Sequence, residues 1–178
     1  TMGASIEQIT WVSTGYLLSN TIIMPIIALL SARFGRKNFY MFGMAVFLLG
    51  SALCGISWNL YSLVIFRILQ GLGGGILMPV AQAILREVFP KEEQGMAMSI
   101  YGLGVVLGPA IGPTLGGWLI EHHNWRWIFY VNLPIGILDL VLISLFIRDP
   151  DFLVRERSKI DYLGVLFMVV GLGAFQVF

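Results

Sequence analysis

The sequence contains few charged residues and almost no cysteine. Asp, Glu, Lys and Arg make up 12% of its 178 residues, whereas they make up about 25% of an average soluble domain. The net charge of +1 excludes a nucleic-acid-binding protein that relies on a basic surface. Cys54 is the single cysteine, which excludes an internal disulfide and a cysteine-built metal site. With 57% hydrophobic residues and a mean hydropathy of +0.84, the chain is predicted to be a membrane protein, not a soluble domain or a disordered segment.

Gaps between the charged residues divide the chain into six hydrophobic segments rich in Leu, Ile, Val, Phe and Gly. They lie near residues 9–32, 39–56, 61–85, 95–120, 127–147 and 161–178. Two of them carry a charge inside, Arg67 in the third and Asp139 in the fifth. A membrane-spanning helix needs about 20 apolar residues, and lipid cannot satisfy the polar groups of an open backbone. We therefore expect an all-α integral membrane protein with about six transmembrane helices.

The basic residues predict how these helices are oriented. Three alternate loops hold nine of the eleven Lys and Arg residues: Arg33, Arg36 and Lys37, then Arg86 and Lys91, then the four in residues 148–159. Because basic residues are enriched in cytoplasmic loops, we expect these three loops to be cytoplasmic. The chain would then begin outside and run inward. We therefore expect at least one helix upstream of this sequence and further helices downstream.

Small residues recur at every fourth position of the fourth hydrophobic segment. The series comprises Gly104, Gly108, Gly112 and Gly116, accompanied by Pro109, Pro113 and Gly117. Such spacing places the glycines on one face of a helix, where a partner helix can approach closely, and the prolines remove backbone donors and bend the helix. We favour a close-packed hinge over ordinary helix packing, because the spacing is repeated and two prolines accompany it.

The third segment combines a permanent charge with an amide and a second small-residue face. Arg67, Gln70, Gly71 and Gly74 lie within two turns of each other. A charge at mid-bilayer costs about 2.5 to 3.5 kcal/mol on insertion scales, so Arg67 needs a partner. Because Arg cannot release its proton, it would act by holding an acidic partner ionised until the geometry changes. The alternative is a static bond between helices.

These segments resemble motifs of the major facilitator superfamily. Leu63, Arg67, Gln70, Gly71, Gly73 and Gly74 resemble its fourth-helix motif, and the glycines and prolines from Gly104 to Gly117 resemble its fifth-helix antiporter motif. Residues 28–37 resemble the motif between helices two and three, although Ala28 and Ala32 replace its usual Gly and Asp; Arg33, Gly35, Arg36 and Lys37 are the matching part. Residues 125–136 and 161–164 are similar to the starts of helices six and seven in the fourteen-helix drug:proton antiporters, the EmrB-like branch.

The resemblance implies a twelve-helix transporter core in two six-helix bundles, with two extra helices between them. This chain would supply part of the N-terminal bundle, helices two to six, in residues 1–147. A cytoplasmic linker would follow in residues 148–160, and an extra seventh helix would start in residues 161–178. Arg33, Gly35, Arg36 and Lys37 would form a cytoplasmic gate loop, although these basic residues also serve simply as the topology signal.

The resemblance also implies that Arg67 pairs chiefly with an acid on the first helix. Arg67 lies about six residues into its helix, some 9 Å deep at 1.5 Å per residue, and within this chain only Asp139 is expected at comparable depth. Asp139 follows Asn132 by two turns on the same face, where it carries a proton or bonds to a neighbouring helix. Tyr16, Asn20, Met24 and Gln70 line a drug cavity or serve in packing.

Three hypotheses for the function follow. The first is a proton-coupled secondary transporter in the inner membrane of a bacterium, which exports drug-like apolar or cationic compounds by alternating access. As the resemblance implies, an EmrA-like periplasmic adaptor and an outer-membrane channel would assist it. The second is a non-transporting membrane scaffold, which leaves Arg67 without a purpose. The third is an intramembrane enzyme, but the sequence has no HExxH, no GxSxG and no paired membrane carboxylates. We expect no cofactor, metal or nucleic-acid partner.

Overall fold

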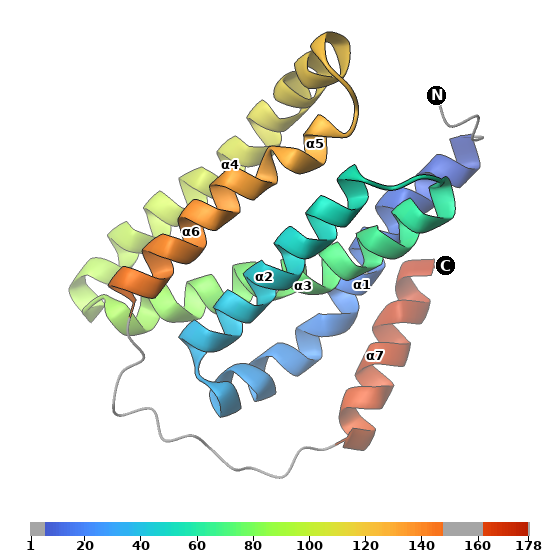
Figure 1. Cartoon of the computed structure of the whole chain (residues 1–178). Coiled ribbons are helices and arrows are strands. Elements are labelled where there is room, and N and C mark those ends of the chain that lie inside the picture. The colour runs from blue at the N-terminus through green and yellow to red at the C-terminus, as the bar shows by residue number, and fades with distance from the viewer. Residues whose placement is uncertain (1–5, 148–161, 178) are drawn as a thin grey trace.

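The structure is a computed structural model that describes residues 6–147 and 162–177 (Figure 1). The elements are α1 (Ile6–Phe34), α2 (Arg36–Gly55), α3 (Leu60–Val88), α4 (Lys91–His122), α5 (Trp127–Tyr130), α6 (Asn132–Phe146) and α7 (Tyr162–Val177). The predicted all-α fold is confirmed. The segment predicted near residues 127–147 is divided at Val131 into α5 and α6. The predicted linker of residues 148–160 lies outside the described residues.

Local sequence signals explain where the helices begin and end. Gly35 forms a one-residue turn between α1 and α2, with φ of 86° and ψ of 144°, a conformation that favours glycine because other residues carry a Cβ atom. Asn59 caps α3, because its side chain accepts a hydrogen bond from the Ser62 N–H at 2.7 Å. The Ser62 hydroxyl oxygen in turn accepts from the Asn59 N–H at 3.3 Å, which completes a capping box.

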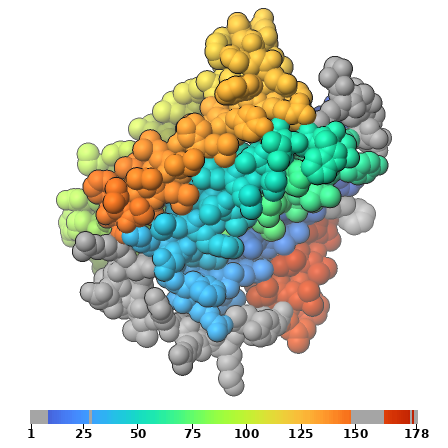
Figure 2. Space-filling model, in the orientation of Figure 1, coloured from blue at the N-terminus to red at the C-terminus, as the bar shows by residue number. Residues whose placement is uncertain are grey.

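Helix α3 is the central element and packs against α1 on one side and α2 on the other. The core between these helices contains Tyr40, Leu48, Ile76 and Val80. Helix α6 covers α2, and the Leu48 side chain contacts the position of Gly136 closely. Figure 2 shows α6 lying directly on α2. Close packing of this kind holds membrane helices together, because lipid is as apolar as the side chains.

Helices α4 and α7 are peripheral. Of the 32 residues of α4, only Ala97 and Leu119 are buried. Helix α7 lies beside α1, away from α6 (Figure 1). Within the described ranges, α2, α3, α4 and the stretch from Trp127 to Phe146 are long and apolar enough to cross a membrane. The turns after α1 and α3 lie at one end of the bundle, and the loops after α2 and α4 lie at the other (Figure 1).

Candidate functional site

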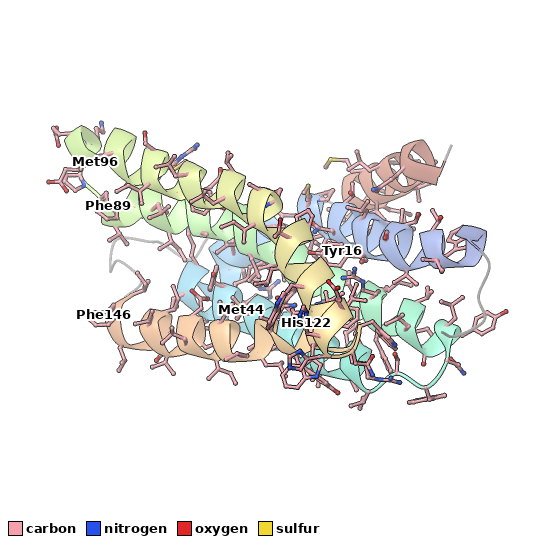
Figure 3. The ribbon with its side chains drawn as sticks, turned by 90° about the horizontal axis from the view of Figure 1, so that it is seen from above. Tyr16, Met44, Phe89, Met96, His122 and Phe146 are labelled. Atoms are coloured by element: carbon pink, nitrogen blue, oxygen red, sulfur yellow. The ribbon has the colours of Figure 1, made fainter. Side chains whose placement is uncertain are left out.

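Arg67 lies in the first third of α3, where this helix faces α1 and α5. Its Nη1 atom donates a hydrogen bond to Gln70 Oε1 at 3.0 Å. Its guanidinium carbon lies 5.1 Å from the ring centroid of Tyr16 on α1 and 5.1 Å from that of Phe129 on α5. Each ring face attracts the cation, by about 0.5 to 2 kcal/mol depending on desolvation. Figure 3 shows Tyr16 near the centre of the molecule.

The Arg67 cation has neutral partners in the part of the chain that the structure describes. Its Nε atom is buried and makes no hydrogen bond there. The acid Glu87 on the same helix pairs with Arg36, not with Arg67. A half-buried guanidinium with five donors is therefore held in place by an amide and two rings, with donor capacity left for a further acceptor.

A buried polar network continues from Arg67 through α2 to α5 and α6. Gln70 is 1% exposed and Ser51 is fully buried. Gln70 Nε2 donates to Ser51 Oγ at 3.0 Å, Asn132 Nδ2 donates to the same atom at 3.1 Å, and Ser51 Oγ donates to the Phe129 carbonyl at 2.9 Å. The sequence interpretation missed Ser51. Its isolated hydroxyl within the apolar segment 39–56 was the available signal.

The glycines beside Gln70 bring α1 and α2 close to the backbone of α3. A Cβ atom at Gly71 would overlap the Ser19 hydroxyl and the Tyr16 carbonyl, and one at Gly74 would lie 2.8 Å from the Tyr16 hydroxyl. A Cβ atom at Gly73 would overlap the Phe47 backbone on α2. The fourth-helix glycines therefore place Tyr16 against Arg67 by allowing α1 to approach.

Asp139 lies elsewhere, between α6 and α2. Its Oδ2 atom accepts a hydrogen bond from the Tyr40 hydroxyl at 3.0 Å. Asp139 and Asn132 line one cavity of about 270 Å³ together with Gly136, so the two polar residues share a face as predicted. Tyr40 precedes Ser51 on α2 by eleven residues, which is about 16 Å along a helix. The expectation that Asp139 lies level with Arg67 is therefore wrong, because Asp139 lies twelve residues beyond Trp127, where the α5–α6 stretch begins, and Arg67 only seven residues beyond the start of α3.

The basic turn between α1 and α2 is bonded to two other helices. Arg36 forms an ion pair with Glu87 near the end of α3, with an Nη2 to Oε1 distance of 2.6 Å. Lys37 Nζ donates to the Ser144 carbonyl on α6 at 2.8 Å. Arg33 is exposed. Gly35 supplies the tight turn, and Glu87 is a partner that the sequence interpretation did not identify.

The glycine series of α4 faces open space in the described structure. A Cβ atom at Gly104, Gly108, Gly112, Gly116 or Gly117 would meet nothing within 4 Å. The helix continues without interruption through Pro109 and Pro113. The partner helix expected for this face is thus not among the described residues. The role of the series as a hinge stays a prediction.

The drug-cavity role of the four residues suggested from the sequence stays a prediction, and Gln70 among them belongs to the buried polar network. Tyr16 contacts Arg67, and Asn20 lies against Gly75 of α3. Met24 is half exposed and lines a separate cavity of about 280 Å³ that also contains Arg36. Across residues 6–147 and 162–177, no cluster of three His, Cys, Asp or Glu side chains could hold a metal ion.

Comparisons with known proteins agree with this architecture. The model of the Major Facilitator Superfamily matches residues 1–175. Curated relatives include the multidrug resistance protein B homolog of Mycobacterium tuberculosis, 42% identical over 97% of this chain and 32% of its own length. Multidrug resistance protein 3 of Bacillus subtilis is 39% identical over 94% of this chain and 32% of its own length.

A third relative is the multidrug export protein EmrB of Haemophilus influenzae. It is 38% identical over 99% of this chain and 34% of its own length. The chain thus spans about a third of the length of the curated relatives that it matches.

Proposed function

Because this multi-pass membrane chain belongs to the Major Facilitator Superfamily, we propose that it forms part of a proton-coupled secondary transporter that exports drugs or other small apolar compounds by alternating access. The names of its relatives, which refer to multidrug resistance and export, support this substrate class. They also favour a transporter over an intramembrane enzyme. Residues 1–147 would form helices two to six of an N-terminal bundle, and α7 would start an extra helix.

The observation that carries the proposal is the setting of Arg67. A guanidinium held by a neutral amide and two rings keeps its charge and retains free donors. An acid on another helix that approaches these donors would be stabilised in its ionised form, and an acid that moves away would take up a proton. Arg67 would therefore couple protonation to movement, with the acid supplied by a first helix.

Two further surfaces support movement between bundles. The small-residue face of α4 is open for close approach by a helix of another bundle. The second surface lies near the C-terminal end of α3, away from Arg67. There the Arg36–Glu87 pair and the Lys37–Ser144 bond fasten the basic turn to α3 and α6. We propose that this turn acts as a cytoplasmic gate loop. Each helix is thus fastened to the turn by one described polar contact, which a movement of the helices can break.

Localisation and assembly follow from the same proposal. The full protein would lie in the inner membrane of a bacterium with its basic loops in the cytoplasm. In a cell with two membranes, an EmrA-like periplasmic adaptor and an outer-membrane channel would carry the exported compound onward.

The test is an efflux assay on the full-length protein in everted membrane vesicles, with ethidium as a fluorescent cationic probe. We expect transport of ethidium to stop when a protonophore collapses the proton gradient. Transport that continues unchanged would contradict proton coupling. Failure to transport any compound of a drug panel, with normal insertion, would favour the scaffold alternative.

A further inference from the structure

The structure assigns Ser51 and Asn132 as positioning residues that set the orientation of Arg67 through Gln70. This inference rests on the proposed function, in which Arg67 is the coupling charge. Neither side chain is charged, and each lies on a different helix from Arg67. They are joined to it by three hydrogen bonds between side chains: Asn132 to Ser51, Gln70 to Ser51 and Arg67 to Gln70.

The hydrogen-bonding capacity of Ser51 fixes the direction of the network. A serine hydroxyl has one proton and two lone pairs. Ser51 gives its proton to the Phe129 carbonyl, so it must accept the bonds from Gln70 and Asn132. The Gln70 amide nitrogen is thereby held at Ser51, and its oxygen faces Arg67. The reversed amide would place N–H groups against the N–H groups of the guanidinium.

The network also closes on itself through Phe129. The Phe129 carbonyl accepts the bond from Ser51, while the Phe129 ring lies over the Arg67 guanidinium. Contacts therefore run from α3 to α2, from α2 to α5, and from α5 back to α3. Since Ser51 and Gln70 are almost completely buried, water cannot replace a lost partner, and the remaining donors would be left unsatisfied. A movement of α5 and α6 against α2 would thus change the position of the guanidinium.

The chain offers a matched control for Ser51. Ser57 is also fully buried, and its hydroxyl donates to the Cys54 carbonyl at 2.8 Å, outside the network. Ser51 and Ser57 both lie three residues from Cys54. Replacing either serine by alanine removes one buried hydroxyl from the same end of the bundle, and only Ser51→Ala removes the acceptor of Gln70.

The first test is a double-mutant cycle in the full-length protein, with proton-driven ethidium efflux as the readout. We expect Ser51→Ala to lower efflux at least tenfold in the wild-type background at normal expression, and Ser57→Ala to change it less than twofold. In an Arg67→Lys background the loss caused by Ser51→Ala should shrink below threefold, because the guanidinium that it positions is gone. If Ser51→Ala lowers efflux by the same factor in the wild-type and Arg67→Lys backgrounds, Ser51 does not position Arg67. Its role would then be structural only.

The second test does not depend on transport. Cys54 Sγ is fully buried and lies 4.0 Å from Gln70 Oε1, so its alkylation by N-ethylmaleimide reports the release of Gln70. We expect at least fivefold faster modification of the Cys54 peptide in Ser51→Ala than in Ser57→Ala, measured by mass spectrometry. Equal rates would overturn the network. Wild-type efflux that ignores the proton gradient would instead contradict the proposed function, and the alkylation result would still decide the network.

Discussion

Helices α3 and α4 carry similar glycine series but use them differently. On α3, a Cβ atom at Gly71 or Gly75 would overlap the backbone or side chains of α1, and one at Gly73 would overlap α2. On α4, a Cβ atom at Gly108 or Gly112 would meet nothing within 4 Å in the described structure. The spacing of the glycines thus indicates a face that another helix can approach. It does not indicate whether the partner lies in the same bundle.

The difference separates residues that hold the bundle together from residues that are available for movement. The α3 glycines bring Tyr16 against Arg67 and allow the polar network to be buried. The α4 glycines leave a smooth face with exposed apolar neighbours such as Leu107 and Ile111. Substitutions of the α3 glycines should therefore act on stability, and substitutions of the α4 glycines should act on transport with stability unchanged.

Gly71→Leu should have the largest effect and would test the packed face. Its Cβ atom alone would overlap a backbone carbonyl, which cannot rotate away as a side chain can. Overpacking of an interior costs about 1 to 3 kcal/mol, occasionally more, so we expect a clearly lower unfolding temperature. Thermal unfolding followed by size-exclusion chromatography of the full-length protein would measure this, with Gly104→Ala as the control.

The control places a methyl group in open space on α4 and should unfold with the wild type. Alanine also has a higher helix propensity than glycine, so this change does not weaken α4. A Gly71→Leu protein that unfolds at the wild-type temperature would contradict the close approach of α1 to α3.

Arg67→Ala should have the next largest effect. It would show whether a residue of α3 can be needed for proton coupling without being needed for folding. Insertion should remain normal, since removal of a costly membrane charge does not oppose it, while proton-driven efflux should be abolished. Arg67→Lys should retain part of the activity, because the charge survives and the planar guanidinium does not. Efflux rates normalised to membrane protein would measure both. Normal efflux by Arg67→Ala that still collapses with the proton gradient would exclude the coupling role.

Gly112→Leu and Gly108→Leu would test the open face. Within the described residues the new side chains meet no neighbour, so we expect wild-type thermal stability of the N-terminal bundle. Efflux should nevertheless fail, because the leucines would block close approach of a helix from another bundle. Wild-type export by both variants would show that transport does not require the α4 glycines. The proposed difference between a packed glycine face on α3 and a glycine face on α4 used in movement would then be wrong.

Much of this arrangement follows from the sequence, because local signals determine it. Charge-free runs located the helices within a few residues, and Gly35 and Pro90 mark where helices meet. Arg67 and Gln70 were identified because a charge and an amide are conspicuous in an apolar segment. Ser51 and Glu87 were not identified, because a lone serine or a single acid near a helix end carries no spacing signal. Their partners lie on other helices or far along the chain, so their roles are visible only in the folded structure.

The error over Asp139 has the same origin. Distance along the chain predicts depth only when each helix is counted from the same membrane surface. Asp139 lies roughly 18 Å from Trp127, the first residue of the stretch that contains α5 and α6, at about 1.5 Å per residue. Arg67 lies roughly 10 Å from Leu60, the first residue of α3. The hydrogen bond to Tyr40 near the start of α2 reflects this greater depth.

Asp139→Asn should have the smallest effect. It would compare the two charged residues inside the apolar segments, Arg67 and Asp139. Arg67 belongs to a network that spans four helices, whereas the described bond of Asp139 is made to Tyr40 alone. An asparagine oxygen still accepts a hydrogen bond from the tyrosine hydroxyl, so α2 and α6 should stay together. We expect the variant to keep at least half of the wild-type efflux at equal expression, with Tyr40→Phe as the control that removes the donor instead. Loss of all transport in Asp139→Asn with normal expression, and not in Tyr40→Phe, would make Asp139 the proton carrier and would move the coupling site from the packed centre of the bundle to the α2–α6 cavity.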